Sequence, residues 1–198
     1  MYLFIPNCVL YIARKTIVME DDPHIEAQQI EEAKKDPQGF EPLYKKYYER
    51  ILRFVYKRMD NLDDTREITQ GVFVKALSNI GKYTHRGHPF SSWLYRIALN
   101  EIAQFYRDAN KMRVISIDTL GISRLAGETE KNRDLSPILA KAMQHLSEEE
   151  VLLLELRFFE DKAFAEVGHI LDITENNAKV KTYRVIDKLR EIFKKLND

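Results

Sequence analysis

Apolar positions recur every three to four residues along most of this chain, a period that is typical of amphipathic α-helices. No segment clearly shows the strict alternation of a strand, so we expect an all-α protein. Local signals mark the helix ends, such as Asp36-Pro37 after the first helix and the capping box of Ser147 and Glu150. The pattern predicts helices over residues 24–35, 40–59, 63–80 and 90–110, a helix opening at Ser136-Pro137, and a final pair over 163–170 and 175–195.

The apolar period is lost over residues 111–135, where glycines and hydroxyl residues are scattered among charges. We interpret this stretch as an interdomain linker. The chain is therefore predicted to form two small helical domains joined by a flexible linker, the C-terminal one containing a helix-turn-helix. The expected divisions are an N-terminal extension over 1–23, a first domain over 24–111, a linker over 112–135 and a second domain over 136–198.

The N-terminal extension is apolar over residues 2–13 and basic at Arg14 and Lys15. A secretory signal has the reverse order, and the run is too short to span a bilayer, so we expect no membrane insertion. Met19 precedes an acidic stretch, and we expect residues 1–18 to be a dispensable extension from a misassigned start. N-terminal sequencing of the natural protein tests this; Met1 or Tyr2 at the terminus would contradict it.

Charge and cysteine content narrow the function classes. The formal net charge of +0 argues against a generic polyanion binder, but acids gather in residues 148–175 and bases in 179–195. This segregation indicates a basic helix that can bind nucleic acid, and the alternative is a charged helix face that only meets water. A lone Cys8 excludes an internal disulfide and a cysteine-based zinc site and favours the cytoplasm. The five histidines show no metal-ligand spacing, so we expect neither metal nor cofactor.

Residues 163–195 have the pattern of a helix-turn-helix. The turn over 171–174 lacks glycine, and Asp172 is predicted to take the positive φ that such turns need. Thr174 caps the second helix, whose Asn and Arg side chains suit base edges in a major groove. The alternative is an ordinary helical hairpin. The predicted buried face comprises Ala178, Val185, Ile186, Leu189 and Phe193; the exposed face comprises Asn176, Asn177, Val180, Lys181, Arg184 and Lys188.

The helix over 63–80 has one apolar half and one acidic half. An exposed Val74 within the acidic half predicts contact with a basic protein partner, the alternative being a face that only meets water. The apolar half comprises Ile68, Val72, Phe73, Ala76, Leu77 and Ile80, and the acidic half comprises Asp63, Asp64, Glu67, Gln70 and Val74.

The helix over 90–110 combines aromatic, cationic and amide groups on its polar side, a mixture that suits unstacked single-stranded bases. The loop before it has the same mixture and is predicted to clasp a flipped base. Trp93 is alternatively a core residue. The buried side comprises Phe90, Leu94, Ile97, Ala98, Ile102 and Phe105; the candidate nucleic-acid residues are Lys82, Tyr83, His85, Arg86, Trp93, Arg96, Asn100 and Arg107.

Three segments together resemble bacterial RNA polymerase sigma factors of the extracytoplasmic-function (ECF) type. Residues 64–77 (DTREITQGVFVKAL) resemble the polymerase-binding helix, and 90–100 (FSSWLYRIALN) resemble the promoter-melting helix. Residues 146–189, which begin LSEEE, resemble the fourth conserved region. The resemblance runs from about residue 25 to 195 and implies a protein that recruits core polymerase to a subset of promoters without catalysing a reaction.

The resemblance also implies roles for individual residues. Asp64, Glu67 and Gln70, with Val74, would dock on the β′ clamp, and the fourth region would meet the β flap. The 82–86 loop and Asn100 would capture a flipped −10 base. Promoter DNA, core polymerase and an anti-sigma factor are the expected partners. The −35 element would meet Asn176, Asn177, Lys179, Val180, Lys181, Arg184 and Lys188.

Two departures from the family pattern stand out. Gly71 occupies a position that is usually acidic, at a cost in helix stability of roughly 1 kcal/mol. Residues 176–178 are Asn-Asn-Ala instead of Gly-Thr-Val, so reading of the −35 element is expected to differ. The alternative function is a stand-alone helix-turn-helix regulator, which a gel shift without polymerase would reveal. An enzyme is disfavoured because no nucleophile elbow or phosphate-binding loop is present.

Overall fold

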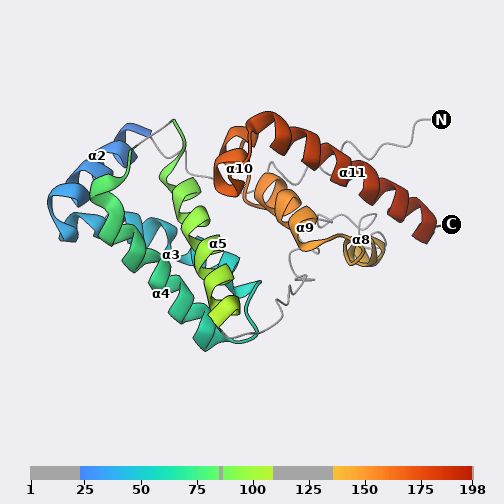
Figure 1. Cartoon of the computed structure of the whole chain (residues 1–198), viewed down its shortest axis with the longest axis horizontal. Coiled ribbons are helices and arrows are strands. Elements are labelled where there is room, and N and C mark those ends of the chain that lie inside the picture. The colour runs from blue at the N-terminus through green and yellow to red at the C-terminus, as the bar shows by residue number, and fades with distance from the viewer. Residues whose placement is uncertain (1–22, 85–86, 109–135, 198) are drawn as a thin grey trace. The chain divides into compact units, whose positions relative to one another are not determined.

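The computed structural model describes residues 23–84, 87–108 and 136–197, and these residues are helical with no strand among them. They divide into two compact units (Figure 1). The N-terminal unit contains α2 (Pro23–Lys35), the 3-10 turn η1 (Pro37–Phe40), α3 (Glu41–Tyr56), α4 (Leu62–Asn79), η2 (Ile80–Lys82) and α5 (Phe90–Asp108). The C-terminal unit contains α8 (Ser136–Met143), α9 (Glu148–Leu154), the π-helical turn η3 (Glu155–Phe159), α10 (Phe164–Leu171) and α11 (Glu175–Asn197).

The all-α prediction is confirmed for the described residues, and the expected helices over 24–35, 63–80 and 90–110 correspond to α2, α4 and α5. Their ends follow from local side chains. Asn61 Oδ1 accepts a hydrogen bond from Asp64 N at 2.8 Å and so caps α4. The predicted capping box of α9 is present, since Ser147 N donates to Glu150 Oε2 and Glu150 N donates to Ser147 Oγ.

The helix expected over about residues 40–59 corresponds to α3, which follows the 3-10 turn η1 and ends three residues earlier than expected. Asp36 Oδ1 accepts a hydrogen bond from Gln38 N at 2.9 Å and starts the 3-10 turn η1. Gly39 lets this turn approach α2, because a Cβ on Gly39 would lie 2.8 Å from the carbonyl carbon of Glu32. At the other end α3 stops at Tyr56.

The core of the N-terminal unit lies where α3, α4 and α5 pack on one another. Tyr44 of α3 is 37% exposed, because its ring lies at the edge of the α3–α4 interface, 4.9 Å from the ring of Phe73. Ile97 and Phe105 are only half-buried, whereas Tyr95, which the pattern missed, is fully buried. The fully buried side chains of this core include Leu43, Ile51, Phe54, Val72, Phe90, Leu94, Tyr95 and Ile102.

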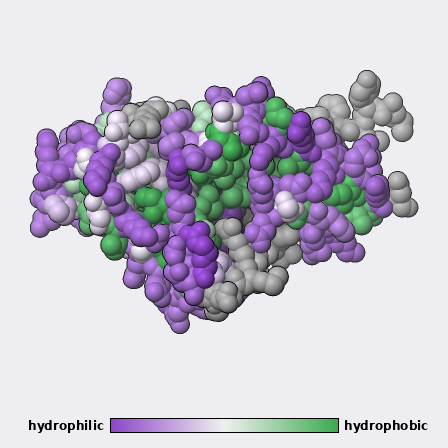
Figure 2. Space-filling view, in the orientation of Figure 1, coloured by the Kyte–Doolittle hydropathy of each residue, from purple (hydrophilic) through white to green (hydrophobic). Residues whose placement is uncertain are grey.

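The C-terminal unit packs α8 and α9 against α11. Its buried apolar residues include Leu153, Leu156, Val167, Ile170, Ala178 and Val185, and Met143 adds a second cluster with Leu139, Phe159 and Leu189. Figure 2 shows hydrophilic residues over most of the visible surface, with hydrophobic patches among them.

Several expectations concern residues outside the described ranges. These are the extension before residue 23, the linker over 112–135, and the loop residues His85 and Arg86. Within the described ranges, no helix is both long and apolar enough to cross a membrane. The described His, Cys, Asp and Glu side chains form no group of three or more that could hold a metal ion.

Candidate nucleic-acid interface

The turn between α10 and α11 has the geometry of a helix-turn-helix. Asp172 adopts the predicted left-handed conformation, with φ 58° and ψ 41°, which ends α10. Ile173 N then donates to Gly168 O at 2.9 Å. Gly168 permits this closure, because a Cβ there would lie 2.8 Å from Ile173 O. Thr174 Oγ1 accepts a hydrogen bond from Asn177 N at 3.2 Å and caps α11 as predicted.

The exposed face of α11 is close to the predicted one. Ala178 and Val185 are buried, and so is Thr182, whose Oγ1 donates to Ala178 O at 2.8 Å. The buried threonine was missed because its hydroxyl is satisfied within the helix itself, and this allows a polar residue to lie on an apolar face. The exposed residues of the predicted −35 set are Asn176, Asn177, Lys179, Val180, Arg184 and Lys188, and Lys181 is half-exposed.

Two lysines of this face are held by acidic residues of α9. Lys181 Nζ lies 2.5 Å from Glu149 Oε1, and Lys188 Nζ lies 2.7 Å from Glu150 Oε2. Burial alone would raise the pKa of Glu150, but hydrogen bonds from Lys188 and the backbone of Ser147 outweigh it and lower that pKa. The acidic segment noticed in the sequence therefore contributes carboxylates to the edge of the basic helix.

The exposed face of α4 carries the predicted partner-binding residues. Glu67, Gln70 and Val74 are exposed, and Val74 is 62% exposed despite being apolar. Asp64 is half-buried and accepts a hydrogen bond from Asn61 Nδ2 at 2.8 Å, so it also belongs to the helix cap. This face thus combines carboxylate, amide and methyl groups along one side of a helix.

Behind that face, α4 buries two threonines that the apolar pattern did not identify. Thr65 Oγ1 donates to Asn61 O, and Thr69 Oγ1 donates to Thr65 O at 2.7 Å. Both side chains are fully buried, and both satisfy their hydroxyl groups along the helix.

A cluster of three aromatic rings lies where η2 ends and α5 begins. The ring of Tyr83 lies 4.7 Å from the ring of Trp93 and 5.3 Å from that of Phe90. Trp93 is half-buried, and its ring lies 5.4 Å from that of Phe90, so it packs against the core and is also partly accessible at the surface. Burial, and secondarily the charge of Glu26, raises the pKa of Tyr83 to about 12. Tyr83 is therefore a packed part of this surface.

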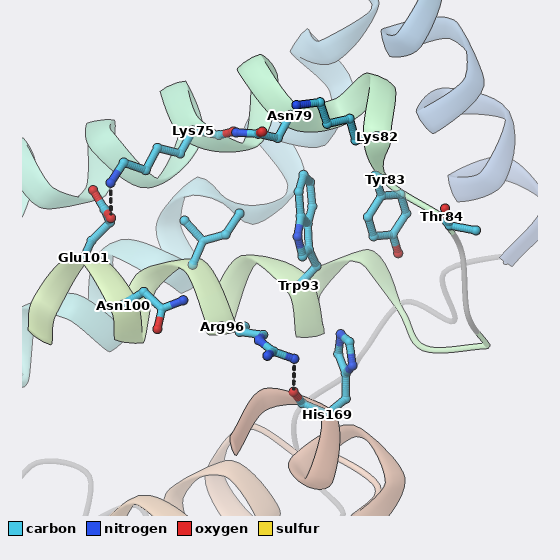
Figure 3. Close-up of a pocket in the computed structure, with 11 residues that line it drawn as sticks. Lys75, Asn79, Lys82, Tyr83, Thr84, Trp93, Arg96, Asn100, Glu101 and His169 are labelled. Carbon is cyan, nitrogen blue, oxygen red and sulfur yellow. Dashed lines mark hydrogen bonds and ion pairs between the residues drawn. The ribbon is translucent and has the colours of Figure 1, made fainter. Parts of the chain in front are cut away.

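The same surface contains polar residues from α4 that the sequence analysis did not single out. Lys75 and Asn79 come from α4, and Asn100 and Glu101 come from α5 on the facing side (Figure 3). Lys75 Nζ and Glu101 Oε1 form an ion pair at 2.5 Å that joins the two helices. Because the partners are 26 residues apart, helical periodicity gave no sign of it.

The remaining candidate residues of α5 differ in their surroundings. Asn100 is exposed, and Arg96 is half-buried on the same side. Arg107 is exposed near the end of α5 and donates to Gln104 Oε1 at 2.7 Å. Lys82 is exposed at the end of η2. The structure therefore brings Lys82, Tyr83, Trp93, Arg96 and Asn100 to one surface of the N-terminal unit.

A helical unit with an aromatic and cationic surface, and a second unit with a helix-turn-helix, are features typical of DNA-binding transcription factors. The model of sigma-70 region 2 matches residues 43–112, and that of sigma-70 region 4 matches residues 142–191. The chain belongs to the sigma-70 family of RNA polymerase sigma factors, in its ECF group.

Curated relatives agree with this assignment. The chain is 26% identical over 162 residues to the ECF RNA polymerase sigma factor BldN of Streptomyces coelicolor; the match spans 78% of this chain and 60% of BldN. It is 27% identical to the RNA polymerase sigma factor YlaC of Bacillus subtilis, over 77% of this chain and 95% of YlaC. It is 23% identical to the ECF sigma factor SigW of Bacillus subtilis, over 83% of this chain and 94% of SigW.

A solved structure shows the same fold. CnrH in complex with the cytosolic domain of CnrY matches with a TM-score of 0.59 and 16% identity, over 85% of this chain and 97% of that chain.

Proposed function

We propose that this protein binds core RNA polymerase through α4, holds unstacked −10 bases on the α5 surface and reads the −35 element with α11. Each DNA-binding role is assigned from the chemistry of the side chains on that surface. Stacking rings and amide groups suit single-stranded bases, whereas a capped helix with amide and guanidinium groups suits the major groove of duplex DNA.

The exposed face of α4 is the observation that carries the proposal. An isolated surface valine means little, but Val74 stands beside Glu67 and Gln70 on one exposed side of a helix within the region 2 match. Such a face fits a basic protein surface that also has apolar groups. We assign this partner as the β′ clamp of core polymerase, with the β flap as the partner of the C-terminal unit.

Promoter melting in this proposal needs no nucleotide hydrolysis. Bases that leave the duplex gain stacking on Trp93 and hydrogen bonds from Asn100, and each stacked base contributes about 1–3 kcal/mol. Lys82 and Arg96 supply positive charge for the phosphates of the captured strand. An anti-sigma factor that covers the α4 or DNA-binding faces is the expected regulator, since CnrH is seen in complex with CnrY.

Binding to core polymerase tests the proposal most directly. Glu67→Lys reverses one charge on an exposed side chain and should abolish co-migration with core polymerase on size exclusion. The matched control is Glu49→Lys, which makes the same change at an exposed position of α3 and should leave binding intact. Circular dichroism of both variants checks that the helices remain.

The results with the two variants distinguish binding through α4 from a general effect of charge. Loss of the complex in Glu67→Lys alone supports the α4 face, and loss in both variants indicates a general charge effect. Wild-type protein that binds a promoter duplex tightly but never binds core polymerase would refute the proposal in favour of a stand-alone regulator.

A further inference from the structure

Glu26 is a buried carboxylate that joins three helices of the N-terminal unit. It lies on α2 and is only 7% exposed. Its Oε1 accepts a hydrogen bond from Phe90 N at 2.8 Å, and its Oε2 accepts one from Tyr47 OH at 2.7 Å. Lys46 Nζ lies 3.3 Å from Oε2 and compensates the buried charge. A carboxylate is kept in such a place only when partners of this kind surround it.

The hydrogen bond from Phe90 N to Glu26 lies at the start of a helix, because Phe90 is the first residue of α5. The first N–H groups of a helix have no partner within the helix, and the helix dipole places partial positive charge there. Glu26 therefore acts as an N-terminal cap for α5, but it is supplied from 64 residues earlier in the chain. Capping from a distant buried position fixes where the helix begins and also ties that point to α2 and α3.

Phe90 connects this cap to the candidate base-binding surface. Its fully buried ring packs against Phe40 and Tyr47 of the core, at 6.3 and 6.0 Å, and also against Tyr83 and Trp93. A shift of the α5 N-terminus would consequently move Trp93, which lies one turn further along the helix, and break its contact with Tyr83. The region 2 match begins at residue 43 and therefore does not include α2.

We propose that Glu26 is a positioning residue for base capture: its carboxylate holds the start of α5 so that Tyr83, Trp93 and Asn100 keep one geometry. The proposal rests on the proposed function of the α5 surface. It adds a role for α2, which would otherwise be only a helix that covers the core.

The test uses the full chain assembled with core polymerase and a fluorescein-labelled pool of random ten-nucleotide single-stranded DNA. Glu26→Ala removes all three interactions and should weaken binding of this pool at least fivefold, with unchanged affinity for core polymerase. Glu26→Gln keeps an oxygen for Phe90 N and should recover most of the binding. Ile102→Val, a small deletion in the buried side of α5, is the stability control and should bind like wild type at temperatures below its unfolding.

A purely structural role predicts a different result. Glu26→Ala would then lower the unfolding temperature as Ile102→Val does, yet bind the pool like wild type, and the proposal would be overturned. Should Glu26→Ala fail to fold, Tyr47→Phe removes one hydrogen bond to the same carboxylate and should weaken pool binding about twofold; no change would overturn the proposal. Wild-type chain that binds core polymerase but not the pool would instead refute base capture by α5.

Discussion

The two candidate DNA surfaces are built in different ways. On the α5 surface, Trp93 and Tyr83 pack edge-to-face against the buried Phe90, so the binding groups are continuous with the hydrophobic core. On α11, the candidate groups stand on an exposed face, and Lys181 and Lys188 pair with acids of α9. Core packing therefore fixes the geometry of the α5 surface. On α11, exposed ion pairs determine how much lysine charge is available to DNA, and salt or single substitutions change that amount.

The largest expected effect comes from a backbone requirement of the α11 surface. Gly168→Ala would place a Cβ 2.8 Å from Ile173 O and 3.1 Å from Glu175 N. Because these are backbone atoms that cannot swing aside, we expect the C-terminal unit to lose at least about 2 kcal/mol of unfolding free energy in urea.

The matched control lies in the N-terminal unit. A Cβ on Gly71 meets only Glu101 Oε2, at an ordinary 3.6 Å, so Gly71→Ala should stabilise α4 by roughly 1 kcal/mol. Equal effects of the two substitutions would contradict the geometry of the turn.

The next largest effect concerns base reading by α11. Arg184→Ala should weaken binding to a promoter fragment selected by the holoenzyme by about 1–3 kcal/mol if the guanidinium reads a base. Competition with duplexes changed at single −35 positions measures this, and Arg190→Ala is the control on the same helix. A loss that is equal for every duplex would mean that Arg184 contacts phosphate.

A smaller effect should reveal the charge balance on α11. Glu149→Gln frees Lys181 from its pair and should tighten duplex binding by the holoenzyme about twofold at low salt, with the difference vanishing at high salt. Glu191→Gln changes the net charge equally at another exposed acid, next to Lys194, and should have less effect. If both variants tighten binding alike, the α9 acids act only through net charge.

The smallest effect is the pH dependence of the melting temperature, which tests whether Tyr83 is packed into the α5 surface. The pKa of Tyr83 is raised from 10.0 to about 12, so the folded state holds this proton more firmly than the unfolded chain. Stability from this group is complete below about pH 10 and is lost as the pH rises towards 12. The melting temperature of the wild type should fall more steeply across that window than that of Tyr83→Phe. Parallel curves would show that Tyr83 is not buried against Trp93 and Phe90.

Features governed by near neighbours in the chain were predictable from sequence. The caps by Asn61, Ser147 and Thr174, and the left-handed Asp172, depend on residues within a few positions of each other. Their geometry follows from local hydrogen bonding, which any reader of the sequence can evaluate.

Features that depend on distant partners were not predictable. Glu26 looks like a solvent-facing residue of a short helix, since its partner Phe90 lies 64 positions away. Likewise, Lys181 and Lys188 looked free until α9 brought Glu149 and Glu150 beside them. Buried Tyr95 was missed because its hydroxyl accepts a hydrogen bond from Arg50 Nε at 3.0 Å, another long-range contact. Helical periodicity identifies faces, but it cannot identify which polar groups find partners across the fold.

The contact between Tyr83 and Trp93 has an optical consequence. Trp93 is the only tryptophan of the chain, so all indole emission of the free protein originates at this surface. With the ring of Tyr83 4.7 Å away, excitation of that phenol passes to Trp93, and a change in this contact alters the emission wavelength and lifetime of a single indole. The protein thus carries a native reporter, with no label attached, of the contact between Tyr83 and Trp93, which stopped-flow fluorescence can follow when DNA is added.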